Sequence, residues 1–233
     1  MQQVVATSVA RVASVPPQQP AFPMTAKRRS ALAGQADLFP AAPALPAGFA
    51  YREGVISPGE EQALVARFAA LPFQPFEFHG YLGKRRVVSF GWRYDYAGGR
   101  LRQSDDPPPF LLPLRCAAAA FAGVPPDSLQ QILVTEYAPG AGIGWHRDRP
   151  MFEEIVAVSF LSPCTLRFRR KHGAGWERAA QEVGGRSAYL LRGEARRGWY
   201  HSIPPVDRLR YSVTFRNFTA SRTPARGNAL TDD

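Results

Sequence analysis

The sequence predicts an α+β protein whose core is an antiparallel β-sandwich or barrel, with helices placed ahead of most of the strands. Proline and glycine are frequent, with 22 and 20 residues in a chain of 233, which favours many turns and short strands over a helical bundle. Two helix-like segments precede residue 131. From there onward the chain consists of short β-rich runs separated by turn signals.

The folded part is expected to open with a short strand near residues 51–55, followed by a helix. Ser57-Pro58-Gly59-Glu60 combines an N-cap serine, proline at the first helical position and glutamate three residues after the serine, which is a capping box. Apolar residues then recur at helical spacing: Leu64, Val65, Phe68 and Leu71. A second helix is predicted over residues 110–121, after a proline-rich break.

Five later segments are predicted as strands because they are short, β-branched or aromatic, and bounded by turn residues. They cover residues 132–137, 155–161, 165–169, 187–191 and 209–216. His172 is expected in a solvent-exposed turn between two of these strands. Residues 1–45 are predicted to be a disordered extension, residues 46–218 the folded domain, and residues 219–233 a disordered tail.

The formal net charge is +10, most of it from arginine. This charge favours a polyanionic partner, nucleic acid first, although an arginine-rich composition alone would produce the same charge. No segment has the ~20 apolar residues that span a bilayer. Cys116 and Cys164 form no CxxC pair, which fits a reducing compartment. We therefore expect a monomer in the cytoplasm, associated with the nucleoid if the source is bacterial.

The N-terminal extension contains no acidic residue in its first 36 positions, so it is either a disordered linker or a targeting segment. Within it, Gln35-Ala36-Asp37-Leu38-Phe39 resembles the peptide by which bacterial replication and repair proteins dock on the sliding clamp. The alternative is an apolar anchor that holds the linker to the domain.

His146 and Asp148 lie two positions apart, so their side chains point the same way if the chain is extended there. His201 follows at the end of an apolar strand. If the three converge, they form a 2-His-1-carboxylate set that holds Fe(II) on one face and leaves positions open for a co-substrate and oxygen. Zinc can use the same ligands, so the ligand set alone leaves the metal open.

The segment Arg210-Tyr-Ser-Val-Thr-Phe-Arg216 alternates polar and apolar residues. Period two places Arg210, Ser212, Thr214 and Arg216 on one face of a strand and the apolar residues on the core face. Two arginines on one strand face predict an anion between them, and a dicarboxylate could be held by one guanidinium at each end. The alternative is a solvated strand face.

Taken together, these motifs resemble the AlkB family of 2-oxoglutarate- and Fe(II)-dependent dioxygenases over residues 50–218. The motifs that carry the resemblance are Glu136-Tyr-Ala-Pro-Gly140, Gly144-Trp-His-Arg-Asp148, Ile155-Val-Ala-Val-Ser159, Arg192-Gly-Glu-Ala-Arg196, Trp199-Tyr-His201 and Arg210-Tyr-Ser-Val-Thr-Phe-Arg216. The resemblance implies a double-stranded β-helix (jelly-roll) core, flanking N-terminal helices and a nucleotide-recognition lid.

The resemblance also implies roles for individual residues. His146, Asp148 and His201 would be the catalytic iron ligands. Arg210 and Tyr137 would bind the distal carboxylate of 2-oxoglutarate, and Arg216 would bind the carboxylate beside the keto group.

The chain departs from the family at three positions. Thr135 and Ser212 stand where the family often has asparagine. Both keep a hydrogen-bonding oxygen, so we expect co-substrate binding to survive. Pro150 stands where repair members commonly carry an acid that helps to read the base, which leaves base preference open.

Residues 76–96 occupy the place of the family's lid, and they interleave aromatic and basic side chains. Cations there would contact phosphates, and rings would stack on a base or fill its place. The residues expected to contact substrate are Phe78, Lys84, Arg85, Arg86, Trp92 and Tyr94. The alternative is an amphipathic hairpin with Val87, Phe90 and Trp92 in the core.

The function implied is oxidative demethylation of alkylated nucleic-acid bases, as in DNA repair, with RNA as a further substrate. Two alternatives stay open at this point. One is a hydroxylase of a protein or a small molecule on the same fold. The other is a nucleic-acid-binding module without activity.

Overall fold

The computed structural model describes residues 44–78, 81–95, 100–220 and 230–231. The predicted extension 1–45, apart from its last two residues, and the clamp-like segment Gln35–Phe39 lie outside the described residues, so both stay predictions. The described residues form one compact unit. Within the described part of the chain, no helix has the length and apolar character needed to cross a membrane.

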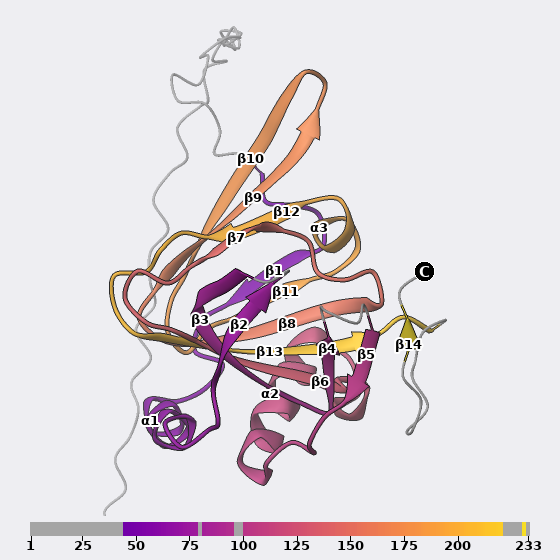
Figure 1. The fold of residues 1–233 in the computed structure, drawn as a ribbon. Coiled ribbons are helices and arrows are strands. Elements are labelled where there is room, and N and C mark those ends of the chain that lie inside the picture. The colour runs from indigo at the N-terminus through magenta and orange to yellow at the C-terminus, as the bar shows by residue number, and fades with distance from the viewer. Residues whose placement is uncertain (1–43, 79–80, 96–99, 221–229, 232–233) are drawn as a thin grey trace, which may run out of the picture. The chain divides into compact units, whose positions relative to one another are not determined.

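The larger sheet has seven strands joined by antiparallel pairs (Figure 1). In spatial order the strands are β1 (Phe49–Arg52), β11 (Ala188–Leu191), β8 (Phe152–Leu161), β13 (Arg210–Phe218), β6 (Gln131–Tyr137), β3 (Tyr81–Phe90) and β2 (Gln74–Phe78). The central strands β8, β13 and β6 are distant in sequence from β3, so the sheet depends on long-range pairing.

A second sheet of four strands lies against the first. Its order is β10 (Gly175–Val183), β9 (Cys164–His172), β12 (Tyr200–Ile203) and β7 (Ile143–His146). A small third sheet joins β14 (Leu230–Thr231), β5 (Arg100–Gln103) and β4 (Trp92–Asp95). The inner faces of the two larger sheets share one apolar cluster that includes Ile155, Leu166, Phe168 and Leu191. This arrangement is the predicted jelly-roll core.

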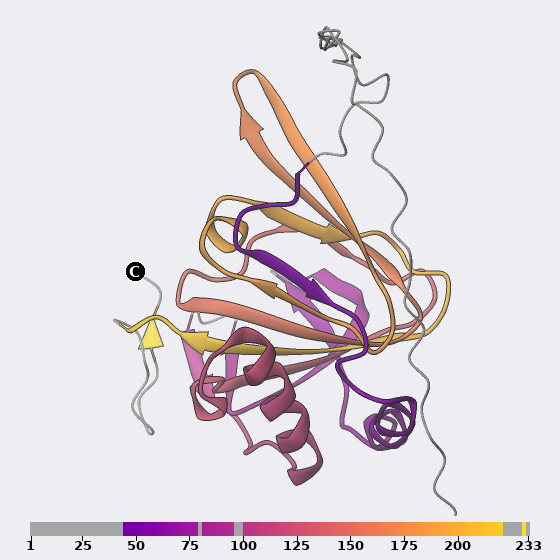
Figure 2. The same cartoon turned by 180° about the vertical axis from the view of Figure 1, so that it is seen from behind.

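The helices α1 (Pro58–Phe68) and α2 (Leu112–Ala122) cover the outer face of the larger sheet (Figure 2). Two 3-10 turns, η1 (Pro109–Leu111) and η2 (Pro126–Ser128), flank α2, and α3 (Gly193–Arg197) follows β11. The predicted capping box is confirmed, since the Ser57 hydroxyl accepts from the Glu60 backbone N–H and the Glu60 carboxylate accepts from the Ser57 N–H.

Strand β13 has the predicted alternation. Its apolar residues Tyr211, Val213 and Phe215 lie in the cluster beneath the helices. Its polar residues, from Arg210 to Arg216, therefore face the space between the two large sheets. A sheet that is covered on both faces buries polar residues only where they have partners or a ligand.

Several predicted boundaries are wrong. The first strand begins at Phe49 and ends at Arg52. Strand β9 extends to His172, which is exposed as predicted but belongs to the strand rather than to a turn. Of the tail predicted as disordered, Leu230–Thr231 pairs with β5. The segment predicted as the lid, residues 76–96, contains the end of β2, all of β3 and β4, whereas β5, the partner of β4, lies beyond it.

Candidate metal centre and its cleft

The pairing of β7 with β12 brings the two predicted histidine ligands together. His146 is the last residue of β7, and its Cα partner across the pair is His201 on β12. Directly paired residues on antiparallel strands point to the same face. Their rings lie with centroids 4.2 Å apart. Asp148 follows two residues after β7, so the local chain delivers a carboxylate to the same point.

The three side chains have the geometry of a possible metal site. One ligand atom from each of His146, Asp148 and His201 lies within 4.8 Å of the other two. His201 Nε2 is 3.4 Å from Asp148 Oδ2, and His201 Nδ1 is buried without a partner in the described residues. Two imidazoles and one carboxylate form a donor set that Fe(II) accepts, so the residues fit this metal.

The protonation states also suit metal binding. Burial, together with the neighbouring His201, lowers the pKa of His146 to about 4, so its ring is neutral at pH 7 and can donate a lone pair. Burial alone would raise the pKa of Asp148, but Arg216 and His201 hold it well below its usual value. The carboxylate is therefore ionised, as a metal ligand must be.

Arg216 ties the acidic ligand to the large sheet. Its Nε and Nη2 lie 2.9 Å and 2.8 Å from Asp148 Oδ1, and its Nη1 donates to Gln131 Oε1 at 2.8 Å. These contacts use three of the five guanidinium N–H donors, which leaves two for a further acceptor. The arginine is thus placed to orient Asp148 and to bind an anion beside it.

Arg210 is a fully buried cation, 0% exposed. Its Nη2 donates to Ser159 Oγ at 2.7 Å, whereas its Nε and Nη1 have no hydrogen-bond partner among the described residues. The guanidinium carbon lies 4.9 Å from the centroid of the Tyr137 ring. A buried cation with unsatisfied donors is costly unless an anion accepts from it, so this geometry fits a carboxylate ligand.

Two of the three positions that depart from the family are paired with each other. Thr135 on β6 and Ser212 on β13 are direct Cα partners, and the exposed fractions of the two residues are 4% and 3%. Both line the cleft above the triad. The two residues therefore lie side by side in the wall of the cleft, and their part in binding the co-substrate stays a prediction.

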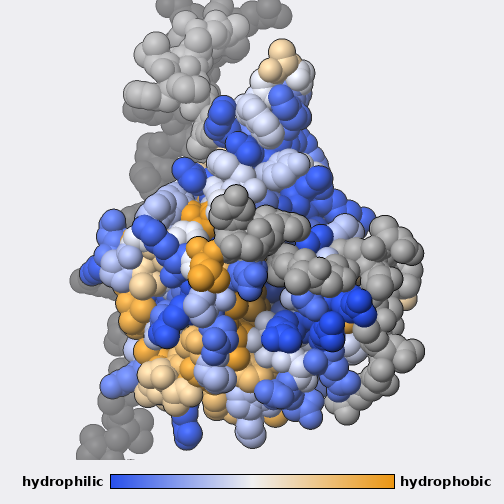
Figure 3. Space-filling view, in the orientation of Figure 1, coloured by the Kyte–Doolittle hydropathy of each residue, from blue (hydrophilic) through white to orange (hydrophobic). Residues whose placement is uncertain are grey.

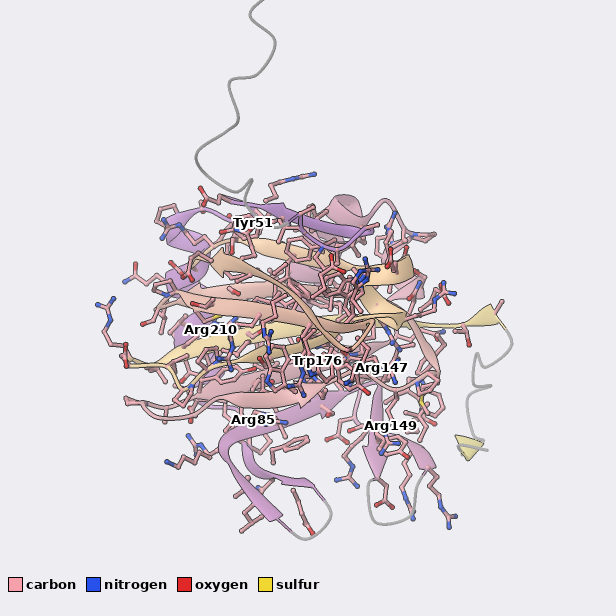
Figure 4. All side chains as sticks on the ribbon, turned by 90° about the horizontal axis from the view of Figure 1, so that it is seen from above. Tyr51, Arg85, Arg147, Arg149, Trp176 and Arg210 are labelled. Carbon is pink, nitrogen blue, oxygen red and sulfur yellow. The ribbon has the colours of Figure 1, made fainter. Side chains whose placement is uncertain are left out.

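The triad lies in a cleft of about 1550 Å³. Strands β3, β6 and β13, the β4–β5 hairpin and the segment after β7 all contribute to its lining. Arginines contributing to the lining include Arg85 from β3 and Arg147 and Arg149 from the segment after β7 (Figure 4). Such a volume accommodates a co-substrate together with a nucleotide-sized group.

Two predicted substrate contacts need correction. Trp92 is 6% exposed and packs edge-on against Phe218 in the core, so its ring cannot stack on a base. Arg86 points away from the cleft, since Glu136 accepts from its Nε and Nη2 at 2.7 Å and 2.9 Å. Strand alternation explains this, because Arg86 points to the opposite face of the sheet from its neighbour Arg85, which lines the cleft.

The other predicted substrate residues divide by position. Arg85 and Tyr94 line the cleft. The Arg85 guanidinium carbon lies 3.7 Å from the centroid of the Phe76 ring. The Arg149 guanidinium carbon lies 4.3 Å from the centroid of the Tyr94 ring. Lys84 is exposed and does not contribute to the lining of this cleft. Phe78 ends β2, and its side chain lies outside the described residues.

Sequence analysis missed three residues that support the site. Gln131 and Ser159 hold Arg216 and Arg210, and single polar residues within β-rich runs carried no signal of this role. Arg196 is 4% exposed and donates to the carbonyl oxygens of Arg149 and Phe152. Burial lowers the pKa of Arg196, an effect that Asp148 opposes. Its contacts brace the loop after Asp148.

Comparisons with known proteins agree with this geometry. The family described as the 2OG-Fe(II) oxygenase superfamily matches residues 54–219. An Arabidopsis thaliana protein named "Alkylated DNA repair protein ALKBH8 homolog" is 30% identical, over 58% of this chain and 47% of its own length. An uncharacterized protein of Acanthamoeba polyphaga mimivirus is 33% identical, over 37% of this chain and 47% of its own length. The chain thus spans about half the length of these relatives.

A solved structure extends the comparison to the fold. The structure of OsALKBH1 matches with a TM-score of 0.59 and 14% identity, and the match covers 75% of this chain and 98% of that one. This likeness supports the jelly-roll architecture. The family match covers most of the chain and includes the whole triad and both arginines. The chain therefore belongs to the 2OG-Fe(II) oxygenase superfamily, whose cofactors are Fe(II) and 2-oxoglutarate, and its triad supplies a possible metal site.

Proposed function

We propose that this chain removes alkyl groups oxidatively from nucleic-acid bases, DNA before RNA. The observation that carries the proposal is the position of the triad within a cleft lined by cationic and aromatic side chains. A curated relative named as an alkylated DNA repair protein homolog supports the same substrate class. Cations that contact phosphates, and rings that contact bases, are the pairing that nucleic acids require.

His146, Asp148 and His201 would hold Fe(II) in this site. When bound, Fe(II) and 2-oxoglutarate supply the oxidation, in which one oxygen atom of O₂ enters a substrate C–H bond and the other enters succinate as CO₂ leaves. On an N-methyl group the product is an N-hydroxymethyl group. It releases formaldehyde and leaves the free base.

Arg210 and Arg216 would hold the two carboxylates of 2-oxoglutarate. Arg210 provides two buried donors without a partner beside the Tyr137 ring, which suits the distal carboxylate. Arg216 has donors left after it contacts Asp148 and Gln131, which suits the carboxylate next to the keto group. Thr135 and Ser212 would add hydroxyl groups on the same side of the cleft.

The substrate base would enter between the β4–β5 hairpin and the segment after Asp148. Tyr94 and Arg149 stack on each other there, with 4.3 Å from guanidinium carbon to ring centroid. At the position of the family's base-reading acid, Pro150 is exposed. Glu153 also lines the cleft, but Arg197 Nη2 lies 2.6 Å from its Oε1. Base recognition would therefore rely more on stacking than on a free carboxylate.

The proposal is tested with Fe(II)-loaded protein, 2-oxoglutarate, ascorbate and an N-methylated single-stranded oligonucleotide. The readouts are succinate and the mass of the oligonucleotide, with Asp148→Ala as the control. Loss of the methyl mass that depends on 2-oxoglutarate and is absent in the variant is the expected result. Succinate without any change in mass would reject nucleic acid and favour a hydroxylase of protein or a small molecule.

A further inference from the structure

The outer face of the four-stranded sheet, turned away from the core, carries an unusual set of charges. Five cations gather there: Arg147, Arg167, Arg169, Lys171 and Arg178. Arg167, Arg169 and Lys171 come from β9, Arg178 from β10, and Arg147 from the position directly after β7. We call these five residues the basic face. The part of the surface over the β9–β10 hairpin is mostly hydrophilic in Figure 3.

The strand register separates the charges of this hairpin by face. Arg169 pairs with Arg178, and Lys171 pairs with Trp176, so these residues share the outer face. The intervening residue Arg170 pairs with Glu177 on the other face, where its Nε lies 2.6 Å from the carboxylate. Carboxylates thus neutralise Arg170 on the inner face, whereas the cations on the outer face lie beside one another without a carboxylate partner among the described residues.

The cations of the basic face have no acidic partner. None of the five forms an ion pair with any residue in the described part of the chain. Arg169 and Arg178 are direct cross-strand partners, an arrangement that costs stability because like charges oppose each other. The acidic residue on this face of the hairpin is Glu182, which lies four positions after Arg178 on β10. Its carboxylate accepts a hydrogen bond from the Thr165 hydroxyl. A polyanion laid along the face would compensate these charges.

Aromatic rings alternate with the cations. The Arg169 guanidinium carbon lies 4.4 Å from the ring centroids of both Trp145 and Trp176, and its Nε is buried without a partner in the described residues. Tyr200 lies edge-on to Trp176, with 6.3 Å between centroids. Half-buried rings held in place by cations offer flat surfaces for bases, while the cations reach phosphates.

The basic face continues into the cleft that holds the triad. Trp145 and Tyr200 contact cations of the face, and both line the cleft together with Arg147, which is itself part of the face. Figure 4 shows Arg147 and Trp176 in one region of the molecule, and Tyr200 contacts both. Figure 1 shows the end of the β9–β10 hairpin projecting beyond the other strands of its sheet. A strand with one nucleotide in the cleft can therefore extend over this face.

We propose that the outer face of the β10-β9-β12-β7 sheet binds the single strand of nucleic acid that flanks the target nucleotide. The identity of the partner rests on the proposed function. The face itself rests on the register, the unpaired cations and the rings. An acidic protein segment would satisfy the charges but would not use the planes of Trp145, Trp176 and Tyr200, so we assign nucleic acid.

The first test measures binding of an unmodified single strand of about 20 nucleotides, longer than the roughly 4–16 that one small binding fold covers. Fluorescence anisotropy is recorded over a range of salt concentrations for wild type, K171Q/R178Q and the control R52Q/R67Q. The control removes the same charge from exposed residues of β1 and α1. Losing two phosphate contacts should reduce the slope of log K against log salt by about 1.4 in K171Q/R178Q. The control should keep the wild-type slope.

The second test examines the rings. Trp176→Ala should weaken binding of the same strand at least about fivefold, and Trp176→Phe should restore most of the loss because stacking needs only a flat ring. Thermal melting of each variant establishes that it is folded. A shorter probe sharpens the result, since the affinity advantage of the long strand over a trinucleotide should shrink in both K171Q/R178Q and Trp176→Ala.

Equal salt slopes for K171Q/R178Q and R52Q/R67Q would overturn the proposal. So would equal competition by polyglutamate at matched charge, because it would point to an acidic protein instead. These tests use unmodified strands and no turnover, so they are independent of the activity assay. A chain that binds through this face but dealkylates no oligonucleotide would reject the proposed function alone.

Discussion

Arg216 contacts a single oxygen of Asp148 through two nitrogens, Nε at 2.9 Å and Nη2 at 2.8 Å. Both side chains are largely buried, with 12% and 8% of their surfaces exposed. The contact connects a proposed metal ligand to an arginine proposed to bind the co-substrate. Outer partners of this kind orient the ligands of a metal, so the metal site and the anion site should depend on each other.

Arg216→Lys should weaken metal binding about 10–100-fold, because a lysine ammonium cannot reproduce the two contacts with Asp148 or the contact with Gln131. Calorimetric titration with Mn(II) under anaerobic conditions measures this affinity. Arg208→Lys, at an exposed position on the same chain segment, is the matched control. Wild-type affinity in Arg216→Lys would show that Asp148 needs no support from this residue.

Arg210→Met should lower the affinity for 2-oxoglutarate by at least about 30-fold, since removing one partner of a buried charge pair costs about 2–5 kcal/mol. The reason is that Arg210 offers buried donors without any other partner in the described residues. Titration of the metal-loaded protein with 2-oxoglutarate measures the change. Arg208→Met provides the control. An unchanged affinity in Arg210→Met would show that the distal carboxylate of 2-oxoglutarate binds at another residue.

Metal binding should stabilise the fold, because it links two paired strands and the segment after one of them. His146 lies on β7, His201 on β12 and Asp148 in the segment after β7. At a metal concentration 100 times the dissociation constant, the free energy of unfolding should rise by about 2.7 kcal/mol. Thermal melting with and without Mn(II) shows this as a higher Tm in the wild type. Asp148→Ala should show no shift at the same concentration, and an equal shift there would place the metal at another site.

Trp92 and Tyr94 are neighbours on one strand but should behave differently when replaced. Trp92→Ala should destabilise the protein by about 3–5 kcal/mol, because it empties a core position beside Phe218. Tyr94→Ala should cost less stability, because Tyr94 is only partly buried against the core, and it should raise the KM for an alkylated oligonucleotide, because Tyr94 lines the cleft. Urea unfolding and steady-state kinetics separate the two effects. A Trp92→Ala variant with wild-type stability and a raised KM would show instead that Trp92 contacts the substrate.

The capping box of α1 gives a prediction with a pH dependence. Hydrogen bonds from Ser57 lower the pKa of Glu60 from its usual 4.5. Stability from the ionised group is therefore present above 4.5 and is lost as pH falls through the lowered value. Glu60→Gln should be less stable than wild type at neutral pH, and the difference should vanish in acid. Urea unfolding at several pH values measures it.

Ser57→Ala removes the same cap from the other side. It should cost about 1 kcal/mol at neutral pH, because the backbone N–H of Glu60 loses its acceptor. The matched comparison is Ser57→Asn, which keeps an acceptor at the N-cap and should retain most of the stability. Equal losses in the two variants would show that the cap contributes nothing.

Local patterns were enough to predict the parts of the fold that depend on neighbours in sequence. The capping box, the alternation of β13 and the two-residue spacing of His146 and Asp148 are of this kind. Each is a pattern between residues only a few positions apart. The meeting of His146 and His201 was expected from the family resemblance, and the pairing of β7 with β12 accounts for it.

The remaining features depend on contacts between distant segments. Trp92 is buried because Phe218, far along the chain, packs against it. Arg86 lies away from the cleft because its strand pairs with β6 in a register that places Glu136 beside it. Strands β7 and β12 have only four residues each, too few for a clear period. No local pattern specifies such partners.

The most direct test of the account is the ratio of formaldehyde to succinate formed on an N-methylated single-stranded oligonucleotide. The Fe(II)-loaded protein is given limiting 2-oxoglutarate, and both products are quantified along with the demethylated strand. We predict one formaldehyde and one demethylated base for nearly every succinate, with both absent in Asp148→Ala. Succinate that accumulates without formaldehyde, at a rate unaffected by the methylated strand, would contradict the proposal that this chain dealkylates nucleic acid.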